Sequence, residues 1–141
     1  MADRQSYIQM ATVFDSLRGP MLAAAIQALQ YPQRSHGLDA GCGIGLQAVS
    51  LANVVGPAGH ITGLDLSAEF LDYAEDLVQE VGLSERITFR EGDVRELPFD
   101  DDSFDWAWSV DCVGYASIEP LPLVKDLTRV VKPGGDIVTL A

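Results

Sequence analysis

The residues with the clearest chemical signature form a glycine-rich turn over residues 38–45, with the sequence LDAGCGIG. Glycines at such a turn let the main chain approach a ligand more closely than a Cβ atom would allow, and a following helix offers unpaired N–H groups. Asp39 lies two residues before Gly41, the first of the three glycines. Its carboxylate would repel a pyrophosphate and attract an ammonium group, directly or through a water. The turn therefore predicts a small ligand that carries a cationic amino group.

The spacing of the glycines separates this turn from the dinucleotide-binding fingerprint. That fingerprint is Gly-x-Gly-x-x-Gly, whereas the glycines here are Gly41, Gly43 and Gly45, and Leu46 stands at the last glycine position. The departure disfavours a nicotinamide cofactor. A turn that only packs a strand against a helix is the alternative interpretation.

Two further acidic residues follow predicted strands. Asp65 ends the second strand, where a carboxylate accepts hydrogen bonds from both hydroxyls of a ribose. The alternative for Asp65 is a role in capping the helix that begins near Ser67. Asp93 lies in the turn 91–94 after the third strand, and a Gly-Asp pair is also ordinary turn chemistry. The position of Asp65 predicts a ligand that contains adenosine, but it does not distinguish one adenosine-containing cofactor from another.

These segments, in this order, resemble the class I S-adenosylmethionine-dependent methyltransferases. The stretch 97–110, LPFDDDSFDWAWSV, is similar to the segment that leads into the fourth strand in the small-molecule branch of that family, which includes quinone- and sterol-type methyltransferases. The turn 132–135, KPGG, completes the pattern. The resemblance covers residue 35 to the C-terminus and implies a methyltransferase with S-adenosylmethionine as its cofactor and a small molecule as its acceptor.

The resemblance also implies a set of cofactor-binding residues. Leu66 would lie against the adenine, Asp93 would accept a hydrogen bond from its exocyclic amine, and the N–H of Val94 would reach a ring nitrogen. The complete set is Asp39, Gly41, Cys42, Gly43, Asp65, Leu66, Gly92, Asp93, Val94 and Ser109.

No residue is assigned as catalytic. The methyl group of a sulfonium is already activated, so the protein has mainly to hold the acceptor in line with it and exclude water. Asp111, Cys112 and Tyr115 follow the fourth strand, near the expected acceptor, and Tyr115 is the expected acceptor contact. The aspartates over 100–102 lie in a polar turn without a second ligand cluster, which predicts a solvated loop and no metal site.

Hydrophobic periodicity predicts an α/β fold, a doubly wound, Rossmann-like parallel sheet with five strands. Such sheets bind ligands at the carboxyl ends of their strands. His36 and His60 each begin a strand, at the opposite end, and receive no catalytic role. The strands are expected over 36–40, 60–65, 86–90, 104–110 and 136–140, and the helices over 46–55, from Ser67 to Gly82, and over 121–131.

The two ends of the chain carry separate expectations. Helices over 7–17 and 21–29, interrupted by Gly19-Pro20, predict a helical cap over 1–34, followed by a cofactor-binding domain over 35–141. The resembled family has seven strands, so this domain is expected to be truncated at its C-terminus, without the final hairpin. An uncovered fifth strand exposes unpaired main-chain groups, which predicts a homodimer through this edge.

Composition narrows the class of protein. The 141 residues are 48% hydrophobic, which favours one globular domain. Twenty-one acidic against nine basic residues give a net charge of −12, which disfavours a nucleic-acid partner. No apolar run is long enough for a membrane span, no signal peptide is evident, and two cysteines make no disulfide framework. A cytoplasmic location is therefore predicted.

Two other functions fit parts of the pattern. A non-catalytic S-adenosylmethionine-binding or regulatory domain would keep the cofactor contacts but lack the final strands. An NAD-dependent oxidoreductase would use the glycine turn and Asp65, but the position of Leu46 and the presence of Asp93 oppose it.

Overall fold

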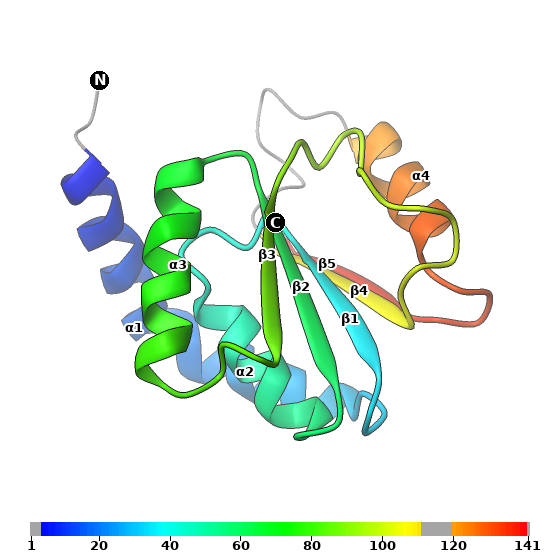
Figure 1. Ribbon diagram of the computed structural model, residues 1–141, viewed down its shortest axis with the longest axis horizontal. Coiled ribbons are helices and arrows are strands. Elements are labelled where there is room, and N and C mark those ends of the chain that lie inside the picture. Colours follow the sequence, from blue (N-terminus) through cyan, green and yellow to red (C-terminus); the bar gives the residue numbers. More distant parts are fainter. Residues whose placement is uncertain (1–3, 111–119, 141) are drawn as a thin grey trace.

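Five parallel strands form a single sheet in the computed structural model, which describes residues 4–110 and 120–140. The strand order is β3-β2-β1-β4-β5, so the winding direction reverses between β1 and β4. Helices α1, α2 and α3 cover one face of the sheet and α4 covers the other (Figure 1). The predicted doubly wound α/β fold is confirmed. The strands are β1 (His36–Ala40), β2 (His60–Asp65), β3 (Ile87–Glu91), β4 (Trp106–Val110) and β5 (Ile137–Leu140).

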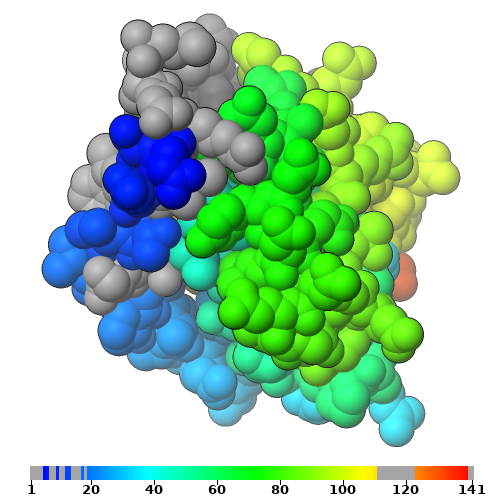
Figure 2. All heavy atoms as spheres, turned by 60° about the vertical axis from the view of Figure 1, so that its left-hand side comes forward, coloured from blue at the N-terminus to red at the C-terminus, as the bar shows by residue number. Residues whose placement is uncertain are grey.

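The local signals at the helix ends act as the sequence predicts. Helix α3 begins after Ser67, whose hydroxyl accepts a hydrogen bond from the N–H of Phe70 at 3.2 Å. Gly56 ends α2, with a φ of +77° that a residue with a side chain rarely adopts. The helices are α1 (Arg4–Leu29), α2 (Leu46–Val55), α3 (Ala68–Glu80) and α4 (Pro120–Val130). Figure 2 shows the covering layer from outside, with α3 and the N-terminal part of α1 at its surface.

Helix α1 contradicts the expectation of two helices separated at Gly19-Pro20. It is continuous from Arg4 to Leu29, with Pro20 inside it. An internal proline removes one main-chain hydrogen bond and costs about 3 kcal/mol. Leu22 and Ile26, which follow the proline, are buried in the core that α1 shares with α2. The burial of these side chains offsets the free-energy cost of the proline within the helix. Local helix propensity could not predict this burial, because it depends on contacts with other elements.

Several boundaries differ from the predicted ones by a residue or two. Strand β4 begins at Trp106, because Phe104 instead forms an isolated bridge with Val131. Strands β3 and β5 and helix α4 are each displaced by one residue at their start. The buried residues of α2 are Ala48, Leu51, Ala52 and Val55.

The two faces of the sheet carry separate cores. Leu38 and Ala40 of β1 pack in the cluster under α4, whereas Trp106 and Trp108 of β4 pack in the cluster under α1 and α2. A Cβ atom at Gly37 would lie 2.1 Å from the ring of Trp106, so only glycine fits beside that indole. This packing sets β1 against β4, where the strand order reverses.

Candidate functional site

The glycine turn between β1 and α2 is held against the end of β2. The N–H groups of Gly41 and Cys42 donate hydrogen bonds to the carbonyl of Leu64 at 2.7 and 2.9 Å. Gly43 has a φ of +55°, and a Cβ atom there would meet none of the described residues within 4 Å. A Cβ atom at Gly45 would instead lie 3.0 Å from the Cβ of Ala74 on α3. Gly45 therefore serves packing, whereas Gly43 faces open space in which a ligand fits.

Asp65 is anchored by two main-chain donors at the end of β2. Its Oδ2 accepts a hydrogen bond from the N–H of Gly43 at 2.9 Å, and its Oδ1 accepts one from the N–H of Ser67 at 3.0 Å. A carboxylate has about four acceptor sites, so both oxygens keep capacity for a diol. The side chain of Leu66 is 66% exposed beside it, which suits an aromatic ring lying on an apolar surface. Asp65 and Leu66 thus place an acceptor carboxylate and an exposed apolar side chain side by side at the end of β2.

Asp39 lies on β1 directly beneath the turn. It is 1% exposed, and its Oδ2 has no hydrogen-bond partner among the described residues. Burial, and secondarily the charge of Asp65, raise the pKa of Asp39 to about 7. A buried carboxylate is costly unless it is paired, so an ammonium group at the turn would supply the missing counter-charge. This environment fits the cationic ligand that the sequence predicts.

The turn after β3 joins the same end of the sheet. Gly92 donates its N–H to the carbonyl of Asp65 at 3.0 Å, and a Cβ atom at Gly92 would lie 2.9 Å from Cδ1 of Leu64. The N–H of Val94 donates no hydrogen bond within the parts of the chain that the structure describes, while its side chain is buried. A main-chain donor is therefore left for a ligand at the expected adenine position.

Asp93 has a partner that the sequence interpretation missed. Arg95 contacts both of its oxygens, with Nε 3.0 Å from Oδ1 and Nη2 2.7 Å from Oδ2. The hydrogen bonds from Arg95 lower the pKa of Asp93 below its ordinary value. An arginine two residues after an aspartate in a turn is a local signal that could have been read. The ion pair keeps Asp93 ionised and able to accept a hydrogen bond from an amine.

Two predicted residues stand apart from this group. Ser109 is fully buried, and its hydroxyl donates to the carbonyl of Ala40 at 2.8 Å, so it links β4 to β1 and faces no open space. Tyr115 lies outside the described residues, as do Asp111 and Cys112. The structure brings together the other predicted cofactor residues, which lie at the carboxyl ends of β1, β2 and β3.

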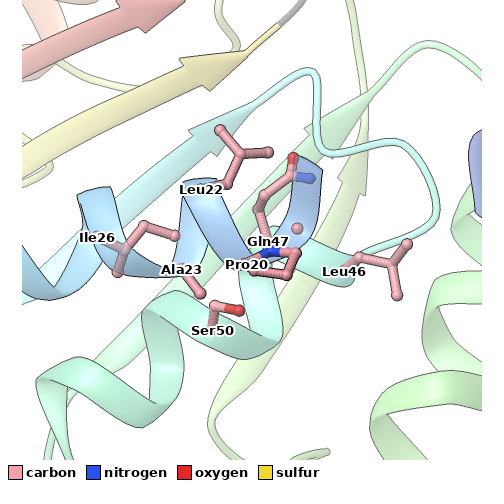
Figure 3. A pocket seen from close by; sticks show the side chains of 8 residues that line it. Pro20, Leu22, Ala23, Ile26, Leu46, Gln47 and Ser50 are labelled. Atoms are coloured by element: carbon pink, nitrogen blue, oxygen red, sulfur yellow. The ribbon is translucent and has the colours of Figure 1, made fainter. Parts of the chain in front are cut away.

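A hollow of about 450 Å³ adjoins the glycine turn, between α1 and α2 (Figure 3). Gln47 and Ser50, near the start of α2, contribute its polar groups. The rest of the lining is Gly19, Pro20, Leu22, Ala23, Ile26 and Leu46. The hollow is mainly apolar, and it is large enough for a small organic molecule.

No cluster of histidine, cysteine, aspartate or glutamate side chains among the described residues is arranged to hold a metal ion. Within the same residues, no helix has the length and apolar character needed to cross a membrane. Asp101, in the acidic turn, is 75% exposed and pairs with Arg129 at 3.1 Å, as suits a solvated loop.

A parallel sheet that reverses between β1 and β4, with a glycine turn after β1 and a carboxylate at the end of β2, defines a Rossmann-like domain. The profile of a family described as a methyltransferase domain matches residues 38–135. The chain belongs to this family. This membership does not favour the NAD-dependent alternative.

Curated relatives extend the comparison. The chain is 37% identical over 110 residues to a demethylmenaquinone methyltransferase from Bacillus cytotoxicus, covering 75% of this chain and 44% of that protein. It is 39% identical over 106 residues to the protein of the same name from Bacillus subtilis, covering 73% of this chain and 43% of that protein. The chain thus spans less than half the length of these relatives.

Solved structures share the fold. The [4+2]-cyclase SpnF has a TM-score of 0.74 and 32% identity, covering 84% of this chain and 43% of that chain. Geranyl diphosphate C-methyltransferase from Streptomyces coelicolor, solved with S-adenosyl-L-homocysteine, has a TM-score of 0.78 and 22% identity, covering 88% and 46% respectively. The second likeness concerns the fold alone.

Proposed function

We propose that this chain is the cofactor-binding part of an S-adenosylmethionine-dependent methyltransferase that acts on a small molecule. The observation that carries the proposal is that two carboxylates with different surroundings, Asp39 and Asp65, lie at the same end of the sheet. Asp65 has free acceptor capacity for a ribose, and Asp39 is a buried carboxylate that none of the described residues pairs with a positive charge. S-adenosylmethionine offers both a ribose diol and an ammonium group. Membership of the methyltransferase-domain family supports the same ligand.

The described residues fit this cofactor along its length. Asp39 would accept the ammonium group, the open space before Gly43 would admit the methionyl chain, and Asp65 would bind the ribose. The exposed side chain of Leu66 would lie against the adenine. Asp93, with the free N–H of Val94, would bind the adenine edge.

The bound cofactor would supply a sulfonium-activated methyl group, so the chain's own residues need only orient the reactants and exclude water. An apolar or weakly polar acceptor is the proposed substrate class. The curated relatives are named for demethylmenaquinone, and a structural neighbour is named for geranyl diphosphate. Tyr115 is the proposed acceptor contact, and Ser109 is a proposed cofactor contact.

Three finer expectations are proposals too. The region 1–34 would act as a helical cap over the domain 35–141, with α1 packed against α2.

Strand β5, which contains the apolar residues Ile137 and Val138, lies at the edge of the described sheet. A further strand would pair with this edge, and for this chain by itself a second copy would supply that strand. Sedimentation of this chain would then show a dimer. The cytoplasmic location remains a prediction from the sequence.

Titration calorimetry tests the central proposal with three probes. S-adenosylhomocysteine should bind, 5′-methylthioadenosine should bind more weakly because it lacks the amino-acid group, and NAD should not bind. Binding of NAD without binding of S-adenosylhomocysteine would contradict the proposal. Incubation with radiolabelled S-adenosylmethionine and a short-chain demethylated naphthoquinol then tests transfer. Binding without transfer would favour a domain that binds the cofactor and does not transfer methyl groups.

A further inference from the structure

Two buried polar atoms on neighbouring strands, one an acceptor and one a donor, lack hydrogen-bond partners among the described residues. Oδ2 of Asp39, on β1, is an acceptor, and Nε1–H of Trp108, on β4, is a donor. Asp39 is 1% exposed and Trp108 is 0% exposed. Neither atom has a hydrogen-bond partner among the described residues. Buried polar groups in folded proteins are almost always paired, so both atoms require an explanation.

The sheet register brings these side chains next to each other. Asp39 and Trp108 are Cα partners in the parallel pairing of β1 with β4. Such partners point to the same face of a sheet, with Cβ atoms about 5 Å apart. Trp108 packs in the core under α1 and α2, and Leu38 and Ala40, which flank Asp39, pack in the opposite core. Asp39 and the indole therefore share the face beneath the glycine turn.

We propose that Trp108 is a positioning residue for Asp39, with its indole N–H donating a hydrogen bond to the Asp39 carboxylate when that carboxylate is charged. A charged carboxylate is a stronger acceptor than a protonated one, so ionisation favours side-chain torsions that join the two atoms. The hydrogen bond would hold the carboxylate toward the turn. Its importance for cofactor binding rests on the function proposed above, whereas the contact itself does not.

Among the described residues, the titratable groups near this pair include Cys42 in the glycine turn and Asp136, whose charge acts on Tyr31. Asp65 lies at the end of β2 and is held by the N–H groups of Gly43 and Ser67. Tyr31, which follows α1, is buried, and desolvation raises its pKa above the ordinary value, so it stays neutral. His36 and His60 begin their strands, at the opposite end of the sheet. Loss of a spectroscopic change at Trp108 in the Asp39→Asn variant would therefore assign that change to Asp39 and not to one of these groups.

Fluorescence tests the contact without any ligand. Trp106 and Trp108 are the two tryptophans of the chain, so Trp106→Phe leaves Trp108 as the sole indole. Its emission should change between pH 5 and 9 in Trp106→Phe and stay constant when Asp39→Asn is added. Adding Asp101→Asn instead, in the exposed acidic turn, should preserve the change. A flat titration in Trp106→Phe, or one that persists with Asp39→Asn, would overturn the proposal.

A double-mutant cycle tests the consequence for binding. Trp108→Phe should weaken S-adenosylhomocysteine binding about tenfold in the native background and leave it unchanged in the Asp39→Asn background. Binding of 5′-methylthioadenosine, which has no ammonium group, should be insensitive to the substitution. The matched control is Trp106→Phe, because Trp106 donates its N–H to Ser35 at 2.8 Å, far from the turn.

If Trp108→Phe weakens S-adenosylhomocysteine binding equally in the native and Asp39→Asn backgrounds, Trp108 acts only through packing and the proposal is overturned. If the unmodified chain does not bind S-adenosylhomocysteine, the proposed function fails, and the ligand-free fluorescence titration still decides whether Trp108 contacts Asp39. If Trp108→Phe fails to fold, the same titration decides the question, because it requires only the Trp106→Phe background.

Discussion

Replacing Asp39 with asparagine should have opposite effects on stability and on ligand binding. The carboxyl group of Asp39 is buried, and its pKa rises from 3.8 to about 7 in the folded chain. Between these two values the folded state keeps a proton that the unfolded state has lost, so the stability of the native chain falls as the pH rises. At about 1.4 kcal/mol for each pH unit, the loss across this window reaches an upper limit of about 4 kcal/mol. Asparagine does not titrate, and Asp39→Asn removes this loss.

Urea unfolding at pH 5, 6, 7 and 8 measures the effect. The difference in unfolding free energy between Asp39→Asn and the native chain should grow in favour of the variant with each step up to pH 7. Above pH 7 this difference should stay constant. Asp101→Asn, in the exposed turn, should follow the native chain at every pH. Parallel stability curves for Asp39→Asn and the native chain would refute the reasoning, because they would show that the buried carboxyl keeps its ordinary pKa.

The same substitution should weaken S-adenosylhomocysteine binding by tenfold or more at pH 8, since the ammonium group loses its counter-charge. In the native chain this affinity should rise from pH 5 to pH 7, as Asp39 gives up its proton more readily. A variant that is both more stable and tighter in binding would contradict the role of Asp39 as the ammonium acceptor.

Three further outcomes are expected. Asp65→Ala should weaken S-adenosylhomocysteine binding by about 2 kcal/mol or more in calorimetry, because two acceptor sites for the ribose are lost. Asp101→Ala should leave the affinity unchanged. Equal affinities of the two variants would show that Asp65 is not part of the site. Gly37→Ala should lower the urea midpoint sharply, because its Cβ would lie 2.1 Å from the Trp106 ring, and an unchanged midpoint would contradict that packing. Arg129→Ala should lower the free energy of unfolding by about 1–3 kcal/mol, because the guanidinium donates hydrogen bonds to the carbonyls of Phe99 and Leu97 at 2.7 and 2.9 Å. A smaller loss than that of the surface control Lys132→Ala would refute this prediction.

The sequence alone predicted the order of the strands along the chain, the helices α2 to α4 and the place of the candidate site, but not the single helix α1. Glycine spacing, a strand-ending aspartate and the Ser67 cap are local signals, and parallel strands gather their carboxyl ends at one edge. The sequence therefore predicts that Asp39, Gly43 and Asp65 lie close together in one candidate site. Strands β1 and β2 and helix α2 were predicted with their observed boundaries for the same reason.

Tertiary packing decided what local patterns do not encode. Pro20 lies within α1 because Leu22 and Ile26 are buried against the sheet, and Phe104 lies outside β4 because it bridges Val131. Ser109 shows the same limit, since the pairing of β1 with β4 directs its hydroxyl to the carbonyl of Ala40.

The electrostatic state of the site also belongs to the tertiary structure. The sequence shows that Asp39 is acidic, but only the packing of the sheet shows that it is buried and in register with Trp108, and that its Oδ2 has no hydrogen-bond partner among the described residues. The two residues are far apart in the chain and meet because β1 and β4 are neighbours where the strand order reverses. Burial and register depend on all the strands together, which is why no local stretch of sequence contains them.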